Sequence, residues 1–414
     1  MVESSLQFHL YQIFLVVAVV LNFLHDNCPV PFSKTLILSG LPTLEQSVEI
    51  TTSPDGQRVV RDRPDMLSYH EEADHRVVQN CNVLGGECGL LIQVAKDIDI
   101  VMINLHHAST ILRQEEGRTV QHLYMRGGTK EHPLYLDVGS LASALNRKYP
   151  DLLPKLPATQ YLSGSDFTCF FFGKGKPSFL KAVIKDLDKH ASLELLGAGA
   201  MDTPLPKNSE AFTACIELYL DVYSSKALSA AHNDNGFEGV DGRRLATFEL
   251  PGFASYDRMI PSTGGLRSQI RRADLQVKKL KNALRGDLRP PNPASGYGYE
   301  QMGENLVFEA SESKTTMRTA FVSCGCVKGD CTGPHCKCRQ NDNKKCSSKC
   351  NCSRLRCANR KLSANGPEIT QDDEEEAAQA EDEDEVDALL ASHTPTIEDE
   401  ELLEGDDDEE LWSS

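Results

Sequence analysis

Nine of the fourteen cysteines fall between Cys324 and Cys357, and they form the strongest chemical pattern in the chain. Their spacing is C-x-C-x4-C-x4-C-x-C-x7-C-x3-C-x-C-x4-C, and the residues are Cys324, Cys326, Cys331, Cys336, Cys338, Cys346, Cys350, Cys352 and Cys357. Such clustering indicates a disulfide scaffold or a metal site, and the redox compartment decides between them. An odd number of thiols leaves one over in a closed set of disulfides. Three tetrahedral zinc ions need twelve sulfur bonds, which nine thiolates supply when three of them bridge, so the pattern predicts a three-zinc cluster.

The charge of the chain is distributed unevenly, although its net value is −18. Residues 362–414 contain 22 Asp and Glu and no Lys or Arg, which leaves 43 basic against 39 acidic residues in 1–361. Residues 324–361 hold ten Lys and Arg and two Asp, so with nine thiolates and three zinc ions this region keeps a charge of about +5, which suits phosphate backbones. The candidate DNA contacts in it are Lys337, Arg339, Arg354 and Arg356.

Five carboxylates further upstream suggest a second kind of metal site. They are Glu72, Asp74, Asp97, Asp99 and Asp166. We expect the apolar run 89–105 to be a strand, in which Asp97 and Asp99 project from the same face because side chains alternate. Acidic side chains in an apolar strand are costly unless a partner neutralises them, and Mg²⁺ or Mn²⁺ with oxygen ligands is one such partner. Two such ions can assist phosphodiester cleavage.

The elements that position these residues follow from local patterns. Ser68 with Glu71 three residues on predicts a capped helix start. Alternation and turn signals predict further strands and helices. The expected strands are 35–41, 48–52, 89–105 and 134–138, with a hairpin around Gly127-Gly128, and the expected helices are 138–149 and 179–195. Strands alternating with helices indicate an α/β domain over residues 35–230.

The remaining segments differ in composition. We expect residues 231–320 to be a linker containing a basic amphipathic helix over 266–285, which either docks on the domain by its apolar stripe or contacts nucleic acid. Residues 321–361 form the cysteine domain. The tail 362–414 is expected to be disordered, because like charges at this density repel, and it is an interaction, autoinhibitory or solubilising segment.

The first 34 residues form an apolar N-terminal segment. The stretch 10–24 is shorter than a membrane span, and no basic residue precedes it. It is either a buried element or a signal or anchor, and we do not expect a membrane protein. The nucleus is the expected location, and secretion or membrane anchoring is the alternative if this stretch acts as a signal or anchor.

The cysteine spacing closely resembles the CXC domain of the tesmin/TSO1 type, in which nine cysteines bind three zinc ions and several members bind DNA. The carboxylate order resembles the flap-endonuclease (XPG/PIN-like) nucleases, with an acidic helix, a D-x-D strand and a G-S-D loop. In that resemblance, Lys174 and Lys176 of the Gly173-Lys-Gly175-Lys turn grip a DNA backbone. The combination resembles a metazoan, transposon-associated family, and implies a PIN/flap-endonuclease-like domain followed by a CXC domain.

The chain departs from that pattern in its N-terminal part, where no acidic residue lies in a strongly apolar strand, so the nuclease-like domain is expected to be incomplete. Phe167 replaces the usual Tyr, and His75 stands where Thr is usual. The leading hypothesis is therefore a nuclear, zinc-dependent DNA-binding protein with an attached, impaired nuclease-like domain. The alternatives are an active Mg²⁺- or Mn²⁺-dependent, structure-specific endonuclease and a scaffold that binds protein partners through its acidic tail. The pattern leaves the oligomeric state open.

Overall fold

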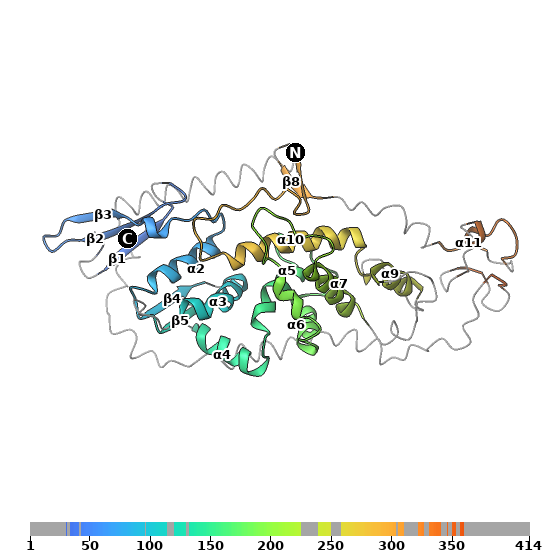
Figure 1. Ribbon diagram of the computed structural model, residues 1–414, viewed down its shortest axis with the longest axis horizontal. Coiled ribbons are helices and arrows are strands. Elements are labelled where there is room, and N and C mark those ends of the chain that lie inside the picture. Colours follow the sequence, from blue (N-terminus) through green and yellow to red (C-terminus); the bar gives the residue numbers. More distant parts are fainter. Residues whose placement is uncertain are drawn as a thin grey trace.

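The computed structural model (Figure 1) describes residues 30, 34–40, 43–95, 97–113, 120–129, 132–224, 239–249, 258–303, 305–309, 322–326, 331–340, 346, 350–352 and 357–359. The apolar stretch 10–24, the acidic tail 362–414 and the candidate contacts Arg354 and Arg356 lie outside the described residues, so the expectations for them stay predictions.

The strands of the described residues form three separate sheets, with strand orders β1-β2-β3, β4-β5-β6 and β7-β8. Their bounds are β1 (Thr35–Ser39), β2 (Ser47–Thr52), β3 (Arg58–Asp62), β4 (Leu90–Val94), β5 (His122–Gly128), β6 (Pro133–Asp137), β7 (Tyr299–Met302) and β8 (Asn305–Phe308). The strands β4 and β5 are parallel, and every other pair is antiparallel. With the helices, these sheets make a mixed α/β protein, as expected.

Helices account for most of the remaining ordered chain. Their bounds are η1 (Pro64–Met66), α2 (Ala73–Leu84), α3 (Ile98–Ile111), α4 (Val138–Lys148), η2 (Leu153–Lys155), α5 (Leu156–Leu162), α6 (Lys176–Lys185), η3 (Ala191–Leu195), α7 (Glu210–Val222), α9 (Gly239–Glu249), α10 (Thr263–Lys281) and α11 (Lys337–Gln340). The predicted helix 138–149 is confirmed as α4, whose N-cap Asp137 accepts a hydrogen bond from the Ser140 amide.

The central sheet fixes the order of the elements around it. Parallel strands need a crossover, and α3 supplies the one that connects β4 to β5. Leu91 and Gln93 of β4 are buried and alternate with exposed Ile92 and Val94, so one face of the sheet packs against helices. The predicted hairpin is confirmed, because β5 turns at Gly128 into antiparallel β6.

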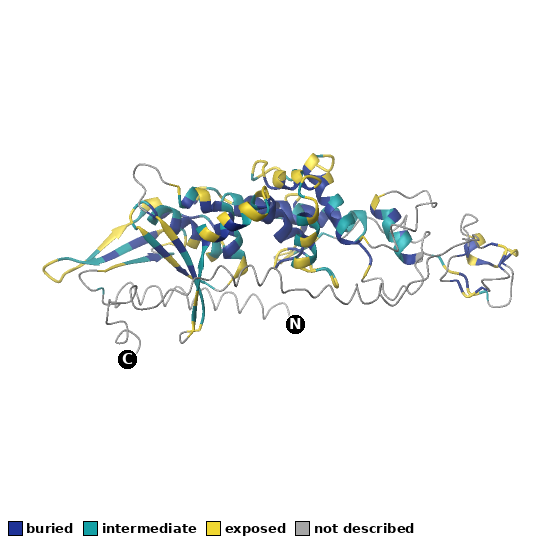
Figure 2. Cartoon of the chain, turned by 90° about the horizontal axis from the view of Figure 1, so that it is seen from below, coloured by how far each residue is buried: buried dark blue, intermediate teal, exposed yellow. Residues whose placement is uncertain are grey.

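One large hydrophobic cluster joins the central sheet with α2–α7, α9 and α10. Figure 2 shows buried residues concentrated along this helical body, whereas the strands of the first sheet carry mostly exposed and intermediate residues. That first sheet has its own small core of Leu38, Val48 and Ile50. Arg63 next to β3 bonds Glu49 of the sheet and Glu87 of the body, which ties the two together.

The amphipathic helix predicted over 266–285 is confirmed as α10, and its apolar stripe docks on the domain. Leu266, Ile270, Val277 and Leu280 are fully buried in the large cluster. Some basic residues of this helix are buried as well. Lys278 is buried and pairs with Asp274 one turn earlier at 2.8 Å, because an isolated buried charge would be too costly. The segment expected to be a linker thus supplies part of the core.

Three other local expectations need correction. The helix predicted to start at Ser68 starts at Ala73, and its N-cap Glu72 makes no side-chain capping bond. The single strand expected over 89–105 is instead the strand β4 followed by the helix α3. The helix expected over 179–195 is split into α6 and η3. In the described part of the chain, no helix combines the length and apolar character needed to cross a bilayer.

Candidate functional site

Four of the five candidate carboxylates lie at the carboxyl end of β4. Asp97 follows this strand and caps α3, where its carboxylate accepts a hydrogen bond from the Asp99 amide at 2.9 Å. The helix α2 leads into β4 through the short turn 85–89, so the start of α2 lies at the end of β4. Glu72 is the N-cap of α2, and Asp74 is in its first turn.

The expectation that Asp97 and Asp99 share one face of a strand is wrong, although both remain next to the sheet. A helix start replaces the strand because Asp97 is a good N-cap and the apolar residues after it recur at helical spacing. The fifth candidate, Asp166, is exposed in the loop after α5. The structure therefore brings together side chains from two helix starts and one loop.

Burial and the charges of neighbouring carboxylates raise the pKa of two of these groups, Asp74 and Asp99. Burial, with further contributions from the charges of Asp97, Glu72 and Asp99, raises the pKa of Asp74 to about 6. Such mutual effects require the groups to lie within electrostatic reach, and they mark a site with excess negative charge. Perturbed carboxylates of this kind are common at metal and catalytic sites.

The pKa of Asp99 is also raised, chiefly by burial, and the charges of Asp97 and Asp166 act in the same direction. Lys176 and Gln160 oppose this rise. The Lys176 ammonium lies 3.8 Å from an Asp99 carboxylate oxygen, and the Gln160 amide donates a hydrogen bond to the same oxygen. The candidate site thus contains a cation that already offsets part of its charge.

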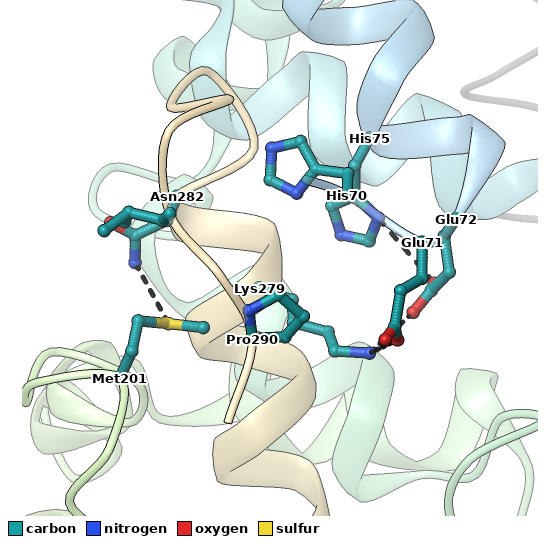
Figure 3. Close-up of a pocket in the computed structure, with 9 residues that line it drawn as sticks. His70, Glu71, Glu72, His75, Met201, Lys279, Asn282 and Pro290 are labelled. Atoms are coloured by element: carbon teal, nitrogen blue, oxygen red, sulfur yellow. Dashed lines mark hydrogen bonds and ion pairs between the residues drawn. The ribbon is translucent and has the colours of Figure 1, made fainter. Parts of the chain in front are cut away.

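A second cation, Lys279 of α10, neutralises the side of the site formed by Glu72. Its Nζ lies 3.0 Å from the Glu72 carboxylate and 3.8 Å from that of Glu71. Figure 3 shows the Lys279 side chain reaching toward both carboxylates across a small pocket. His75, which is buried, lies 3.7 Å from Glu72 on the other side. This pocket borders the carboxylate cluster at Glu72, and neither Asp97 nor Asp99 lines it.

Sequence patterns did not reveal Gln160, Tyr161 or Lys279 as parts of this site. Tyr161 is buried in α5, and burial with the charges of Asp99 and Glu72 raises its pKa. Lys279 is separated from Glu72 by 207 positions, so no local pattern predicts their contact. Only the packing of α10 against α5 and α3 brings them together.

No three of the five candidate carboxylates have ligand oxygens that all lie within 4.8 Å of one another, the spacing that would suit one shared ion. Among the described residues, the groups of three or more ligand atoms within 4.8 Å of one another consist of cysteines. These groups are Cys324-Cys346-Cys350-Cys352, Cys324-Cys336-Cys338-Cys346, Cys324-Cys326-Cys331-Cys336 and Cys331-Cys346-Cys352-Cys357. All nine clustered cysteines belong to at least one group, as their spacing predicts.

The distances between the sulfurs favour metal ligands over disulfides. Sγ of Cys324 lies 3.8 Å from that of Cys331 and 3.8 Å from that of Cys346, and Cys336 and Cys346 are 3.9 Å apart. A disulfide requires about 2.05 Å. A tetrahedron with Zn–S bonds of about 2.3 Å has edges of about 3.8 Å. Thiolate-only groups of this shape are compatible with zinc.

The backbone around the cluster holds several sulfurs in place. The Cys324 amide donates to Sγ of Cys350 at 3.3 Å, and the Asn359 side chain donates to Sγ of Cys346 at 3.4 Å. The Cys346 amide in turn donates to the Asn359 carbonyl. Hydrogen bonds to ligand atoms orient them and lower the cost of gathering negative sulfurs.

The candidate DNA contacts within the described residues fall into two kinds. Lys337 and Arg339 are exposed on α11 on either side of the buried Cys338. Lys174, by contrast, is partly buried with its ammonium 5.9 Å from the centre of the Tyr223 ring, and burial lowers its pKa. Lys176 is half-exposed and paired with Asp99. The structure therefore leaves the two residues of α11 more accessible than Lys174.

Comparisons with protein-family models, with curated proteins and with solved structures found no match. The features of the chain that indicate a function are therefore its two sites, the thiol cluster and the carboxylate cluster.

Proposed function

We propose that the chain is a zinc-dependent DNA-binding protein whose cysteine cluster forms the DNA contact. The observation that carries the proposal is the overlap of the four thiol groups, since any two of them share at least one cysteine. Ions bound in neighbouring groups would have to share thiolates. Three ions with three bridging thiolates use all nine sulfurs, as a CXC domain of the tesmin/TSO1 type does.

Charge supports DNA as the ligand. Residues 324–361 hold ten Lys and Arg against two Asp, so with nine thiolates and three zinc ions the region keeps a charge of about +5. Lys337 and Arg339 point away from the cluster because the helix α11 alternates exposed basic residues with buried Cys338. Basic side chains on a rigid metal-bound scaffold meet the phosphate backbone without first having to be ordered. On the same ground we propose the nucleus as its location.

The test measures zinc and DNA binding on the same full-length protein. We expect about three zinc ions per chain by elemental analysis and duplex binding that weakens steeply with salt. Cys324→Ser, which removes a thiol shared by three groups, lowers both the zinc content and the DNA affinity. Cys88→Ser changes a thiol outside the cluster and serves as the matched control. A protein without zinc, or a Cys324→Ser protein with full zinc and full affinity, contradicts the proposal.

A second function is favoured by the carboxylate cluster, and we propose it as the alternative. The site at the end of β4 has the parts of a Mg²⁺- or Mn²⁺-dependent nuclease of the PIN/flap-endonuclease type. Acidic side chains gather at the carboxyl end of a parallel strand, as ligands do in open α/β sheets. The excess charge that raises the pKa of Asp74 is the charge that a divalent cation would neutralise.

Two lysines already form ion pairs with carboxylates of this site: Lys176 with Asp99, and Lys279 with Glu72. A metal ion would have to displace them or bind beside them. The alternative predicts Mn²⁺-dependent cleavage of DNA that is lost in Asp99→Asn. The matched control is Asp188→Asn, an exposed aspartate in the turn after α6. Equal cleavage by Asp99→Asn and wild type would remove the carboxylate cluster from any catalytic role.

A further inference from the structure

The loop between α5 and α6 displays an unusual run of exposed aromatic side chains. Phe167, Phe170 and Phe172 are 39%, 70% and 61% exposed. Large apolar side chains that are exposed close together mark binding surfaces more often than single exposed ones do. We call these three residues the phenylalanine surface.

The surface belongs to an ordered loop, because its neighbours are anchored in the core. Phe171, which lies between two exposed rings, packs edge-on against Tyr219 with ring centres 5.4 Å apart. Gln269 of α10 both donates to and accepts from the backbone of Cys169. The Tyr299 hydroxyl donates to the Phe167 carbonyl at 2.6 Å. The protein therefore holds these rings outward with a fixed backbone.

Gly164 adds to this arrangement. It has a φ of +119°, and a Cβ at this position would lie 2.7 Å from Cδ1 of Phe170. Only glycine both adopts this backbone conformation easily and leaves room for the ring. The position of Phe170 is thus fixed by contacts on its inner side, while most of its surface remains exposed.

Positive side chains accompany the rings. The Lys279 ammonium lies 5.6 Å from the centre of the Phe167 ring, and the Arg258 guanidinium lies 5.9 Å from that of Phe172. Lys174 follows in the same loop, and Lys176, which is paired with Asp99, begins α6. Phe167 is also the neighbour of Asp166, and Lys279 connects it to Glu72. The surface therefore lies beside the carboxylate cluster.

We propose that the phenylalanine surface binds the unpaired bases of a single-stranded nucleic acid by stacking. Aromatic rings interleaved with basic side chains are the combination that single strands require, since bases stack on the rings and phosphates meet the cations. A duplex hides its base faces and would gain nothing from the rings. This inference rests on the proposed binding of nucleic acid. It adds a preference for single strands and three contact residues, neither of which the cysteine cluster provides.

The test compares strand types on the full-length, zinc-loaded protein without added Mg²⁺ or Mn²⁺, so that cleavage does not interfere. The probes are a labelled oligo(dT) of about 20 nucleotides, an abasic oligonucleotide of equal length and a duplex. We expect Phe170→Ala/Phe172→Ala to weaken oligo(dT) binding by about tenfold or more, the loss of one stacked base. Binding of the abasic strand and of the duplex should change less than twofold. Leu44→Ala removes an exposed apolar side chain from the loop between β1 and β2, away from this surface, and is the matched control.

A second variant reports stacking directly. Phe170→Trp places an indole in the loop, and the chain has one other tryptophan, Trp412. Its fluorescence should be quenched by oligo(dT) but not by the abasic strand, and wild type supplies the Trp412 background. An unquenched Phe170→Trp protein, or an unchanged oligo(dT) affinity in the double alanine variant, overturns the inference.

The remaining outcomes separate this inference from the proposed function. A wild-type protein that binds duplex, combined with a double alanine variant that keeps its oligo(dT) affinity, refutes the phenylalanine surface alone. A wild-type protein that binds no nucleic acid refutes the proposed function as well. If the double alanine variant instead converts a dimer to a monomer in sedimentation velocity, the surface joins two copies of the chain and the inference is wrong.

Discussion

Replacing Asp74 by asparagine removes one negative charge from the carboxylate cluster while keeping the shape of the side chain. Burial of the carboxylate, together with repulsion from its acidic neighbours, makes the ionised form of Asp74 a source of instability in the absence of a metal ion. Above neutral pH, we therefore expect Asp74→Asn to be more stable than wild type. A stabilising substitution at a candidate catalytic position is the expected sign of a site arranged for a ligand.

The magnitude follows from the pKa of Asp74, which rises from 3.8 to about 6. This rise corresponds to at most about 3 kcal/mol of lost stability. Asp74 is partly exposed, so solvent screening reduces the expected gain to about 1 kcal/mol. Because the folded pKa is the higher one, the unfolded chain loses its proton first as the pH rises. The stability of wild type therefore falls relative to the variant between about pH 4 and pH 6, and the difference stays constant above that range.

The assay is thermal unfolding followed by circular dichroism from pH 4 to pH 8. We expect a melting temperature about 2–4 °C higher for Asp74→Asn at pH 8 and no gain at pH 4. Added Mn²⁺ should stabilise wild type more than the variant, because binding to the folded state alone raises stability. Asp188→Asn, the exposed control, should match wild type throughout. A loss of stability in Asp74→Asn that is equal at both pH values would show that Asp74 is a structural hydrogen-bonding residue and would refute the reasoning.

Three further outcomes are expected from the packing of the domain. Lys278→Met leaves Asp274 buried without its partner and should lower the unfolding free energy in urea by about 3–5 kcal/mol, whereas replacing both residues should cost less. Burial lowers the pKa of His106 to about 3. The unfolded chain alone takes up that proton, so this histidine by itself should lower stability below about pH 6.5 by up to about 1.4 kcal/mol per pH unit, and the fall should be shallower by that amount in His106→Gln. Gly164→Ala should lower the unfolding free energy by more than about 1 kcal/mol and weaken oligo(dT) binding, because its Cβ would displace Phe170.

The central error in the prediction of the carboxylate cluster concerns residues 89–105. A continuous apolar run does not distinguish a buried strand from a buried helix by periodicity alone. The available signal was Asp97, whose side chain is well suited to cap a helix that begins at the next residue. With that cap recognised, the strand would have ended before Asp97, and both aspartates would have been expected at the carboxyl end of β4.

The helix α10 shows which features a local pattern predicts and which it does not. The four-three spacing of Leu266, Ile270, Ala273 and Val277 predicted a docked helix, because burial of one stripe is a property of the helix itself. The burial of Lys278 depends on a carboxylate one turn away and on carbonyl groups of a distant loop. The link between Lys279 and Glu72 depends on how two distant helices pack. Neither can be derived from spacing.

The cysteine cluster was the feature most fully specified by its sequence. The nine thiols lie within a segment of about 34 residues, so short loops are enough to bring them into groups with the spacing of metal ligands. The assignment of each thiol to a group depends on the path of the backbone, and Cys331, with a φ of +58°, is one place where that path turns unusually.

The position of α10 has a consequence for how the protein is made. Its C-terminal end and the turn after it bond to elements far earlier in the chain, since the Leu280 carbonyl of α10 accepts from His107 and the Ala283 carbonyl after it accepts from His70. During synthesis, the ribosome therefore releases the sheet, the acidic helix starts and the phenylalanine surface well before the helix that completes their core. Contacts of such long sequence separation form slowly. For that interval, the nascent chain exposes the apolar surface that α10 later covers, and surface of that kind promotes aggregation.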